Sequence, residues 1–122
     1  MILWYDVFIG TDLEAAFILN LDHAGFYCHS RKAVDGKSIT YKLYKKGTFT
    51  LQGATAESRG RFITTDTTPC VEVTFTNQSV KIVLRNKKAV LSTITVKLGF
   101  SSTTNVMVEL EKIVRYIGVL YN

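Results

Sequence analysis

The chain of 122 residues carries 15 lysines and arginines against 10 aspartates and glutamates, a formal net charge of +5. Its 47% hydrophobic and 20% charged residues are ordinary for a globular protein, and the length suits one domain with its own core. Pro69 is the only proline and no tract is rich in Gly, Ser or Pro, so we expect a single β-rich domain over residues 1–122 without a linker.

The sequence argues against export and against a membrane span. "MILWYD" at the N-terminus lacks the basic residues that begin a secretory signal, and the longest uncharged run, residues 98–108, is far too short to cross a bilayer. Without an export signal, Cys28 and Cys70 are expected to be reduced. We therefore predict a protein of the cytoplasm or of a virus-like assembly, not a secreted one.

The N-terminal third leaves two interpretations open. "ILWYDVFI" (residues 2–9) is typical of a strand. In "TDLEAAFILNL" (residues 11–21), Thr11 with Glu14 three positions later is a capping-box pattern that indicates a helix. Alternation of Phe17, Leu19 and Leu21, followed by the turn-like "DHAG", indicates a strand instead. We favour the strand.

The middle of the chain alternates with a period of two, which is typical of half-buried strands. In "KSITYKLYK" (residues 37–45) we expect Ile39, Tyr41 and Leu43 to face inward. The alternate residues Thr40, Lys42 and Tyr44, and Lys46 just after this stretch, are expected on the other face. Gly47 suits a tight turn, after which Phe49 and Leu51 face inward, and residues 54–61 form a loop.

Residues 70–98 predict a three-stranded meander with turns at residues 77–78 and 86–88. Its expected inward residues are all apolar: Val71, Val73, Phe75, Val80, Ile82, Leu84, Val90, Ile94, Val96 and Leu98.

The C-terminal segment changes to a helical period. One stripe collects its apolar residues, Val106, Met107, Leu110, Ile113, Val114 and Ile117, which predicts an amphipathic helix over about residues 104–117. Gly118 stands where a glycine often ends a helix.

Together these elements predict an α+β fold of six to eight mostly antiparallel strands and one C-terminal helix, built as a meander sheet or a partly closed small barrel. In element order alone, this outline resembles small RNA-phage coat proteins and small single-strand-binding barrels.

Charge is distributed unevenly along the chain. Residues 1–30 contain four acids and no lysine or arginine, whereas residues 31–46 contain six basic residues and one acid. A basic strand face with an aromatic side chain suits the phosphate backbone of nucleic acids, although strand lysines also protect sheet edges. The candidate nucleic-acid-binding residues are Arg31, Lys32, Lys37, Lys42, Tyr44, Lys45, Lys46, Lys81, Arg85, Lys87 and Lys88.

Signals of catalysis or metal binding are weak. Adjacent residues of a strand point to opposite faces, so Cys28 and His29 are not expected to share a metal ion unless a bulge intervenes. His23 and Cys70 do not complete a ligand pattern. Asp12 and Glu14 fit solvated acids or a helix cap. Phosphate-binding glycine loops are absent from the sequence, and we expect no catalytic site, metal or cofactor.

The sequence therefore predicts a non-enzymatic protein that binds the nucleic-acid backbone, or another polyanion, through a basic strand face. We expect single strands to be favoured, with low sequence specificity, and we expect a homo-oligomer without membrane contact. One alternative is a coat-like structural subunit of a viral or phage particle; a second is a protein–protein interaction module.

Overall fold

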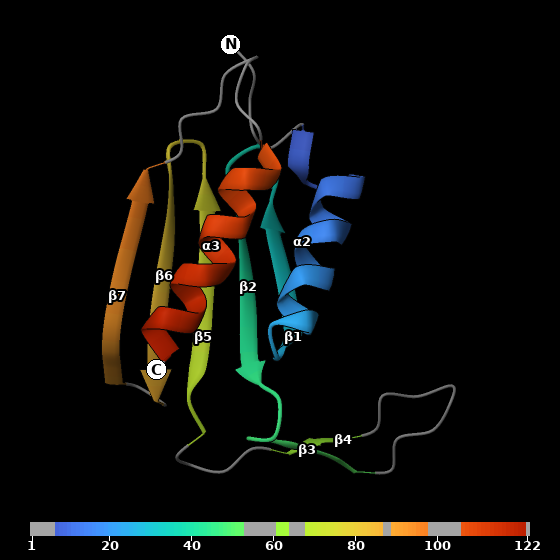
Figure 1. Ribbon diagram of the computed structural model, residues 1–122, viewed down its shortest axis with the longest axis vertical. Helices are drawn as coiled ribbons and strands as arrows, with labels where there is room; N and C mark the ends of the chain where they lie inside the picture. Colours follow the sequence, from blue (N-terminus) through green and yellow to red (C-terminus); the bar gives the residue numbers. More distant parts are fainter. Residues whose placement is uncertain (1–6, 53–60, 64–67, 87–88, 98–105, 122) are drawn as a thin grey trace.

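The computed structural model describes residues 7–52, 61–63, 68–86, 89–97 and 106–121. It has an α+β fold in which helices α2 (Asp12–His23) and α3 (Val106–Tyr121) lie on one face of a five-stranded antiparallel sheet (Figure 1). The strand order is β1-β2-β5-β6-β7, and the bounds are Phe26–Val34, Ser38–Lys45, Cys70–Thr76, Ser79–Asn86 and Ala89–Lys97.

The sheet is open. β1 and β7 are its outer strands and are not paired with each other, so closure into a barrel is not confirmed. The short strands β3 (Thr50–Gln52) and β4 (Arg61–Ile63) pair only with each other, as a ribbon beyond one end of the main sheet (Figure 1).

The predicted alternation of the sheet is confirmed in its three central strands. Every second side chain is turned toward the helices and buried at 9% exposure or less, in the set Ile39, Tyr41, Leu43, Val71, Val73, Phe75, Val80, Ile82 and Leu84. Residues 77–78 connect β5 to β6 as expected, and Gly47 has the positive φ of 90° that its turn requires. The burial of these residues, most of them β-branched or aromatic, forms the sheet side of the core.

Helix α3 is confirmed, but it is longer than predicted. Leu110, Ile113 and Ile117 are at most 1% exposed and cover the sheet. The expectation that Gly118 ends the helix is wrong, because α3 continues to Tyr121, whose ring lies 5.7 Å from that of Phe26. Tertiary packing of the last turn outweighs the roughly 1 kcal/mol that a glycine costs inside a helix.

The strand favoured for residues 11–21 is wrong, because these residues belong to helix α2. Glu14, Phe17 and Leu21 recur at helical spacing and are all buried, whereas Leu19, which completed the alternation, is 54% exposed. The strand expected over residues 2–9 is also wrong where the structure describes it, since Val7 and Phe8 are helical.

The outer strand β7 departs from the predicted pattern. Ile94 and Val96 are half-buried as the alternation implies, but Val90, expected to face inward, is 54% exposed. A shift in the pairing with β6 leaves Leu91 opposite no residue, so the strand is irregular at this end. Leu98, residues 54–60 of the loop expected over 54–61, and the side chain of Leu51 lie outside the described residues. Arg61, expected in that loop, belongs to β4 instead.

Two leucines of the helices test this burial. We expect Leu110→Ala to lower the free energy of unfolding by about 2–5 kcal/mol, because it leaves a cavity between α3 and the sheet. The matched substitution Leu19→Ala removes an exposed side chain and should cost less than about 1 kcal/mol. Denaturant titration of both variants measures the difference, and equal losses would contradict this packing.

Candidate nucleic-acid interface

The face of the sheet turned away from the helices is called the open face. Since Ile39, Tyr41 and Leu43 point into the core, the alternate residues Thr40 and Lys42 must point the other way. Cross-strand pairing extends this face over all five strands, because residues directly opposite each other share a face. Lys32 pairs with Thr40, Thr40 with Thr74, Thr74 with Lys81 and Lys81 with Thr95.

Among the described residues of the sheet, five cations lie on the open face, on four of its strands. Lys42 lies opposite Glu72. Arg85 directly follows the inward-facing Leu84 in β6, so it points away from the core. Lys97 lies two residues beyond Thr95 and was not selected from the sequence, although its alternation with Thr93 and Thr95 was visible there. The open-face cations are Lys32, Lys42, Lys81, Arg85 and Lys97.

The open face keeps a positive excess after its ion pair is counted. Glu72 is the only acid on the described strands of this face, and its Oε1 lies 2.8 Å from Nε of Arg85. Both side chains are about one-third exposed. One acid against the five cations leaves a formal excess of four positive charges, which attracts polyanions.

An aromatic cluster occupies one end of the open face. The ring of Phe49 lies 5.0 Å from that of Tyr27, so the expectation that Phe49 faces inward is wrong. The ring of His29 lies 5.7 Å from that of Tyr44 in an edge-on arrangement. Tyr44 is half-buried; burial, with smaller contributions that include its hydrogen bond to Cys70, raises its pKa to about 12. Tyr44 thus stays neutral and less open to stacking than its place on the strand suggested.

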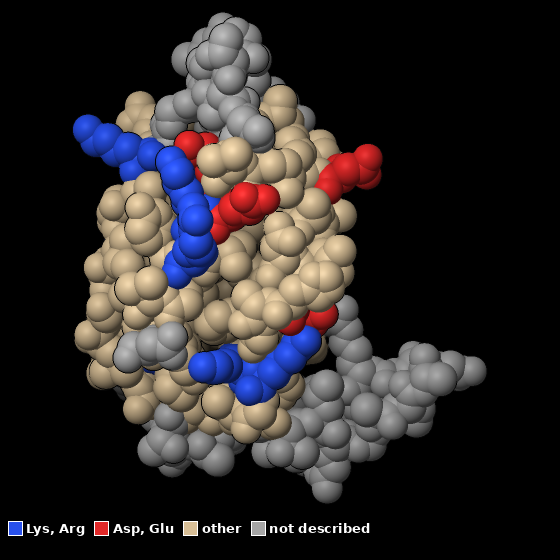
Figure 2. Space-filling model, viewed as in Figure 1, with Lys and Arg blue, Asp and Glu red and all other residues tan. Residues whose placement is uncertain are grey.

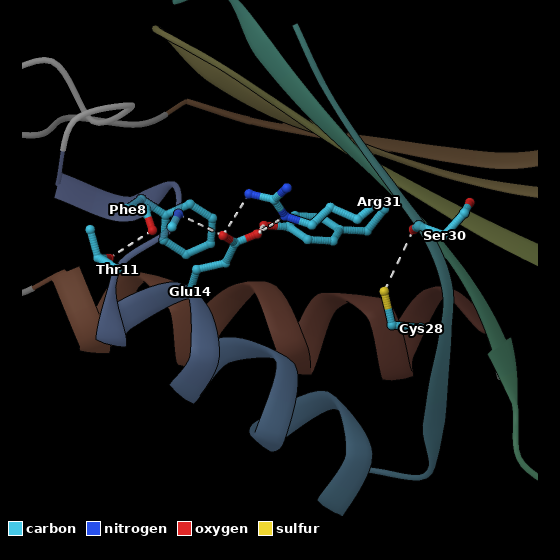
Figure 3. Close-up of polar contacts among 8 residues, drawn as sticks. Phe8, Thr11, Glu14, Cys28, Ser30 and Arg31 are labelled. Atoms are coloured by element: carbon cyan, nitrogen blue, oxygen red, sulfur yellow. Dashed lines mark hydrogen bonds and ion pairs between the residues drawn. The ribbon is translucent and has the colours of Figure 1, made fainter. Parts of the chain in front are cut away.

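A bulge in β1 decides which basic residue reaches the helices. Cys28 pairs with Leu43 and Ser30 with Lys42, so His29 is an extra residue. The bulge reverses the alternation beyond it, and Arg31 therefore points to the helix side while Lys32 points to the open face. The thiol of Cys28 lies 3.5 Å from the carbonyl oxygen of Ser30 across the bulge (Figure 3).

Arg31 binds a buried carboxylate of α2. Its Nε and Nη2 donate to the two oxygens of Glu14 at 2.5 and 2.9 Å, and the hydroxyl of Tyr41 donates to Glu14 at 2.6 Å (Figure 3). The backbone N–H of Gly10 adds a fourth hydrogen bond at 2.7 Å. This Glu14 network joins α2 to β1 and β2; the capping-box pattern had marked Glu14 but could not show its partners.

The network changes the protonation of its members. Burial alone would raise the pKa of Glu14, but hydrogen bonds from Arg31, Tyr41 and Gly10 outweigh it and lower that pKa below 4.5. Burial, followed by the hydrogen bond to Glu14, raises the pKa of Tyr41. Arg31 and Glu14 thus both stay charged, and the two charges balance each other in a structural ion pair. Arg31 does not contribute to the charge of the open face.

The other candidate cations are dispersed. Lys45 is on the helix side, with Nζ 5.0 Å from the centre of the Tyr121 ring, and Lys46 forms an ion pair of 2.6 Å with Asp22. Lys37 follows Gly36 in the β1–β2 turn. Lys87 and Lys88 lie outside the described residues. The structure thus brings together Lys32, Lys42, Lys81 and Arg85 with Tyr44, and separates them from Arg31, Lys45 and Lys46.

The helix-bearing face differs in its charge pattern. Figure 2 shows acidic and basic side chains next to each other near its centre, and Lys112 lies 3.4 Å from Glu109 on α3. Neighbouring opposite charges cancel at a distance, so this face has no comparable excess over its described helices.

The candidate metal residues are not brought together. Cys28 lies on the helix side of β1, His29 on the open face, and Cys70 is buried in β5. Within the described ranges, no group of three or more His, Cys, Asp or Glu residues is placed to hold a metal ion. Neither described helix is long and apolar enough to span a bilayer.

Comparison with known proteins adds no relative: the chain matches no family model, no curated protein and no solved structure.

The Glu14 network predicts a pH dependence of stability. Because the folded-state pKa of Glu14 lies below its unfolded value, its contribution is complete above about pH 4.5 and is lost as the pH falls through the folded-state pKa. Glu14→Gln should lower the free energy of unfolding at pH 7 by about 1–3 kcal/mol. The gap between wild type and variant should shrink as the pH falls below the unfolded-state pKa toward the lower folded-state pKa.

Asp22→Asn is the matched control, since it removes a carboxylate whose ion pair with Lys46 is exposed. Urea titrations across pH 3–7 compare the three proteins. A Glu14→Gln loss no larger than that of Asp22→Asn would contradict the assigned role.

Proposed function

We propose that the protein binds the sugar–phosphate backbone of single-stranded nucleic acid across its open face, without enzymatic activity. The observation that carries this proposal is the shared position of Lys32, Lys42, Lys81, Arg85 and Lys97 on a surface whose described strands carry one acid. Ammonium and guanidinium groups bind phosphates and displace counterions, which makes such binding electrostatic.

The arrangement of the cations supports a ligand that crosses the strands. β1, β2, β6 and β7 each supply at least one cation, and neighbouring strands are about 4.8 Å apart. A flexible single strand can follow this twisted surface and approach the aromatic cluster at its end, where His29 is exposed. Contacts made mainly with phosphates position the ligand but do not read its sequence, so we propose low sequence specificity.

The chemistry of the buried acid supports a non-enzymatic function. Glu14 is the buried carboxylate of the described core, and four donors already satisfy it. Acid–base catalysis needs a group that can exchange a proton near neutral pH, and the lowered pKa of Glu14 opposes this.

A coat-like structural subunit is the second candidate. The exposed apolar residues Val90 and Leu91 on the outer strand β7 favour assembly, and a subunit that packages a genome also needs a basic sheet face. Light scattering separates the two, because a coat subunit forms large closed particles.

Charge reversal tests the open face. For Lys42→Glu with Lys81→Glu, we expect the affinity for a fluorescent single-stranded homopolymer to fall at least about tenfold at moderate salt, since two phosphate contacts are lost. The salt slope, as log Kd against log salt concentration, should decrease by about 1.4 for the two contacts. Fluorescence anisotropy over a salt series measures both.

The matched control is Lys112→Glu with Arg115→Glu, which makes the same change of net charge on the exposed surface of α3. It should bind almost as wild type does. Equal losses in the two double variants would mean that net charge alone drives binding, and salt-independent binding would overturn the proposal.

A further inference from the structure

The two outer strands of the sheet differ in their protection. β1 has a bulge at His29, carries Arg31 and Lys32, and is tied to α2 through Glu14. Bulges and charged side chains keep an edge from pairing with another strand. The β1 edge is therefore a poor template for further pairing.

β7 lacks these protections over most of its length. Residues 89–96 contain no charged side chain, and Lys97 stands at the end of the strand. Residues 92–97 pair regularly with β6, so their outer edge presents a straight row of backbone N–H and C=O groups that no described strand pairs. Threonine, isoleucine and valine dominate this row, and they are the side chains that suit a neighbouring strand.

We propose that the β7 edge pairs antiparallel with the β7 edge of a second copy of this chain, across a two-fold axis perpendicular to the sheet. An antiparallel pair of identical strands is self-complementary, as a two-fold interface requires. The result is a continuous ten-stranded sheet with all helices on one face.

Side-chain parity restricts the register. Residues directly opposite each other must share a face. The axis must therefore lie level with one residue, which then faces its own copy, and not level with the midpoint between two successive residues. With the axis at Ile94, the half-buried Ile94 meets the partner's Ile94, and Thr93 meets the partner's Thr95 on the open face. Lys97 then lies about 20 Å from the partner's Lys97, beyond the range of strong repulsion.

The helix that contacts β7 also leaves apolar side chains exposed. α3 contacts both β6 and β7, and its Tyr116 and Val119 are 38% and 70% exposed. Strand pairing alone buries a small interface, so the dimer should dissociate in the micromolar range. The two open faces become one surface with twice the number of cations. The proposal does not depend on nucleic-acid binding, because the dimer is measured without nucleic acid.

Complementary charges at the axis test the proposal. Two variants are made: Thr93→Lys with Thr95→Lys, and Thr93→Glu with Thr95→Glu. Each places like charges opposite each other in the dimer, so each alone should have a dissociation constant at least about tenfold above wild type. An equimolar mixture should restore association. Sedimentation velocity follows the mass from 13.7 kDa to twice that value, at up to about 100 µM protein.

The control, Ala33→Lys with Val34→Lys, changes exposed residues on the β1 edge and should leave the dimer unchanged. Circular dichroism establishes whether each variant is folded. If the lysine pair unfolds, wild type mixed with the folded glutamate pair is compared with wild type alone. At the same total protein concentration, the mixture should associate less. A wild-type monomer at every concentration, a dimer lost only in the β1 variant, or folded charge variants that fail to associate when mixed would each overturn the proposal.

Discussion

The arrangement of this protein depends on one extra residue in an outer strand. The bulge at His29 reverses the alternation of β1, so that Arg31 points to the helices and reaches Glu14. A carboxylate buried at 6% exposure would be costly alone, but here it accepts four hydrogen bonds, one of them from Tyr41 in the next strand. The same bulge sends Lys32 to the opposite face. One irregularity therefore supplies the core with its counter-charge and the open face with a cation.

This division explains how one sheet serves two purposes. On the helix side, Phe17 packs edge-on against Tyr41 and Phe75, with ring centres 5.7 and 5.5 Å apart, and α3 covers the remaining strands. On the open side, the four lysines are exposed to water, where unpaired charges cost little folding free energy. Most of the buried apolar side chains thus lie on the helix side, although Val83 and Cys70 are also buried on the other side. The charges of the open face can be arranged for a ligand.

The sequence predicted what local periodicity controls. The alternation in β2, β5 and β6 and the apolar stripe of α3 are long and consistent, so the residues that these patterns predicted to face inward are buried. Residues 11–21 carried two periods at once, and the helix is favoured because Phe17 and Leu21 have a partner surface while Leu19 does not. The candidate site was predicted only in part: Lys42, Lys81 and Arg85 follow from alternation, but the inward turn of Arg31 follows from a bulge, and Lys46 is paired by Asp22 from a distant helix. Neither the bulge nor this ion pair can be recognised from the residues next to it in the sequence.

The two proposals meet at the same surface. A nucleic-acid site built from five cations on one copy is small, and each added phosphate contact multiplies the affinity. Pairing through β7 would place a second, symmetry-related set on the same face without moving any residue of the first, because the strand edge and the side chains of the open face are separate groups. The cations nearest the axis would be Lys81 and Lys97, which adjoin β7 or lie on it, whereas Lys32 would lie at the far edges. Binding and association would then strengthen each other, since a strand that spans both copies is held by twice as many contacts.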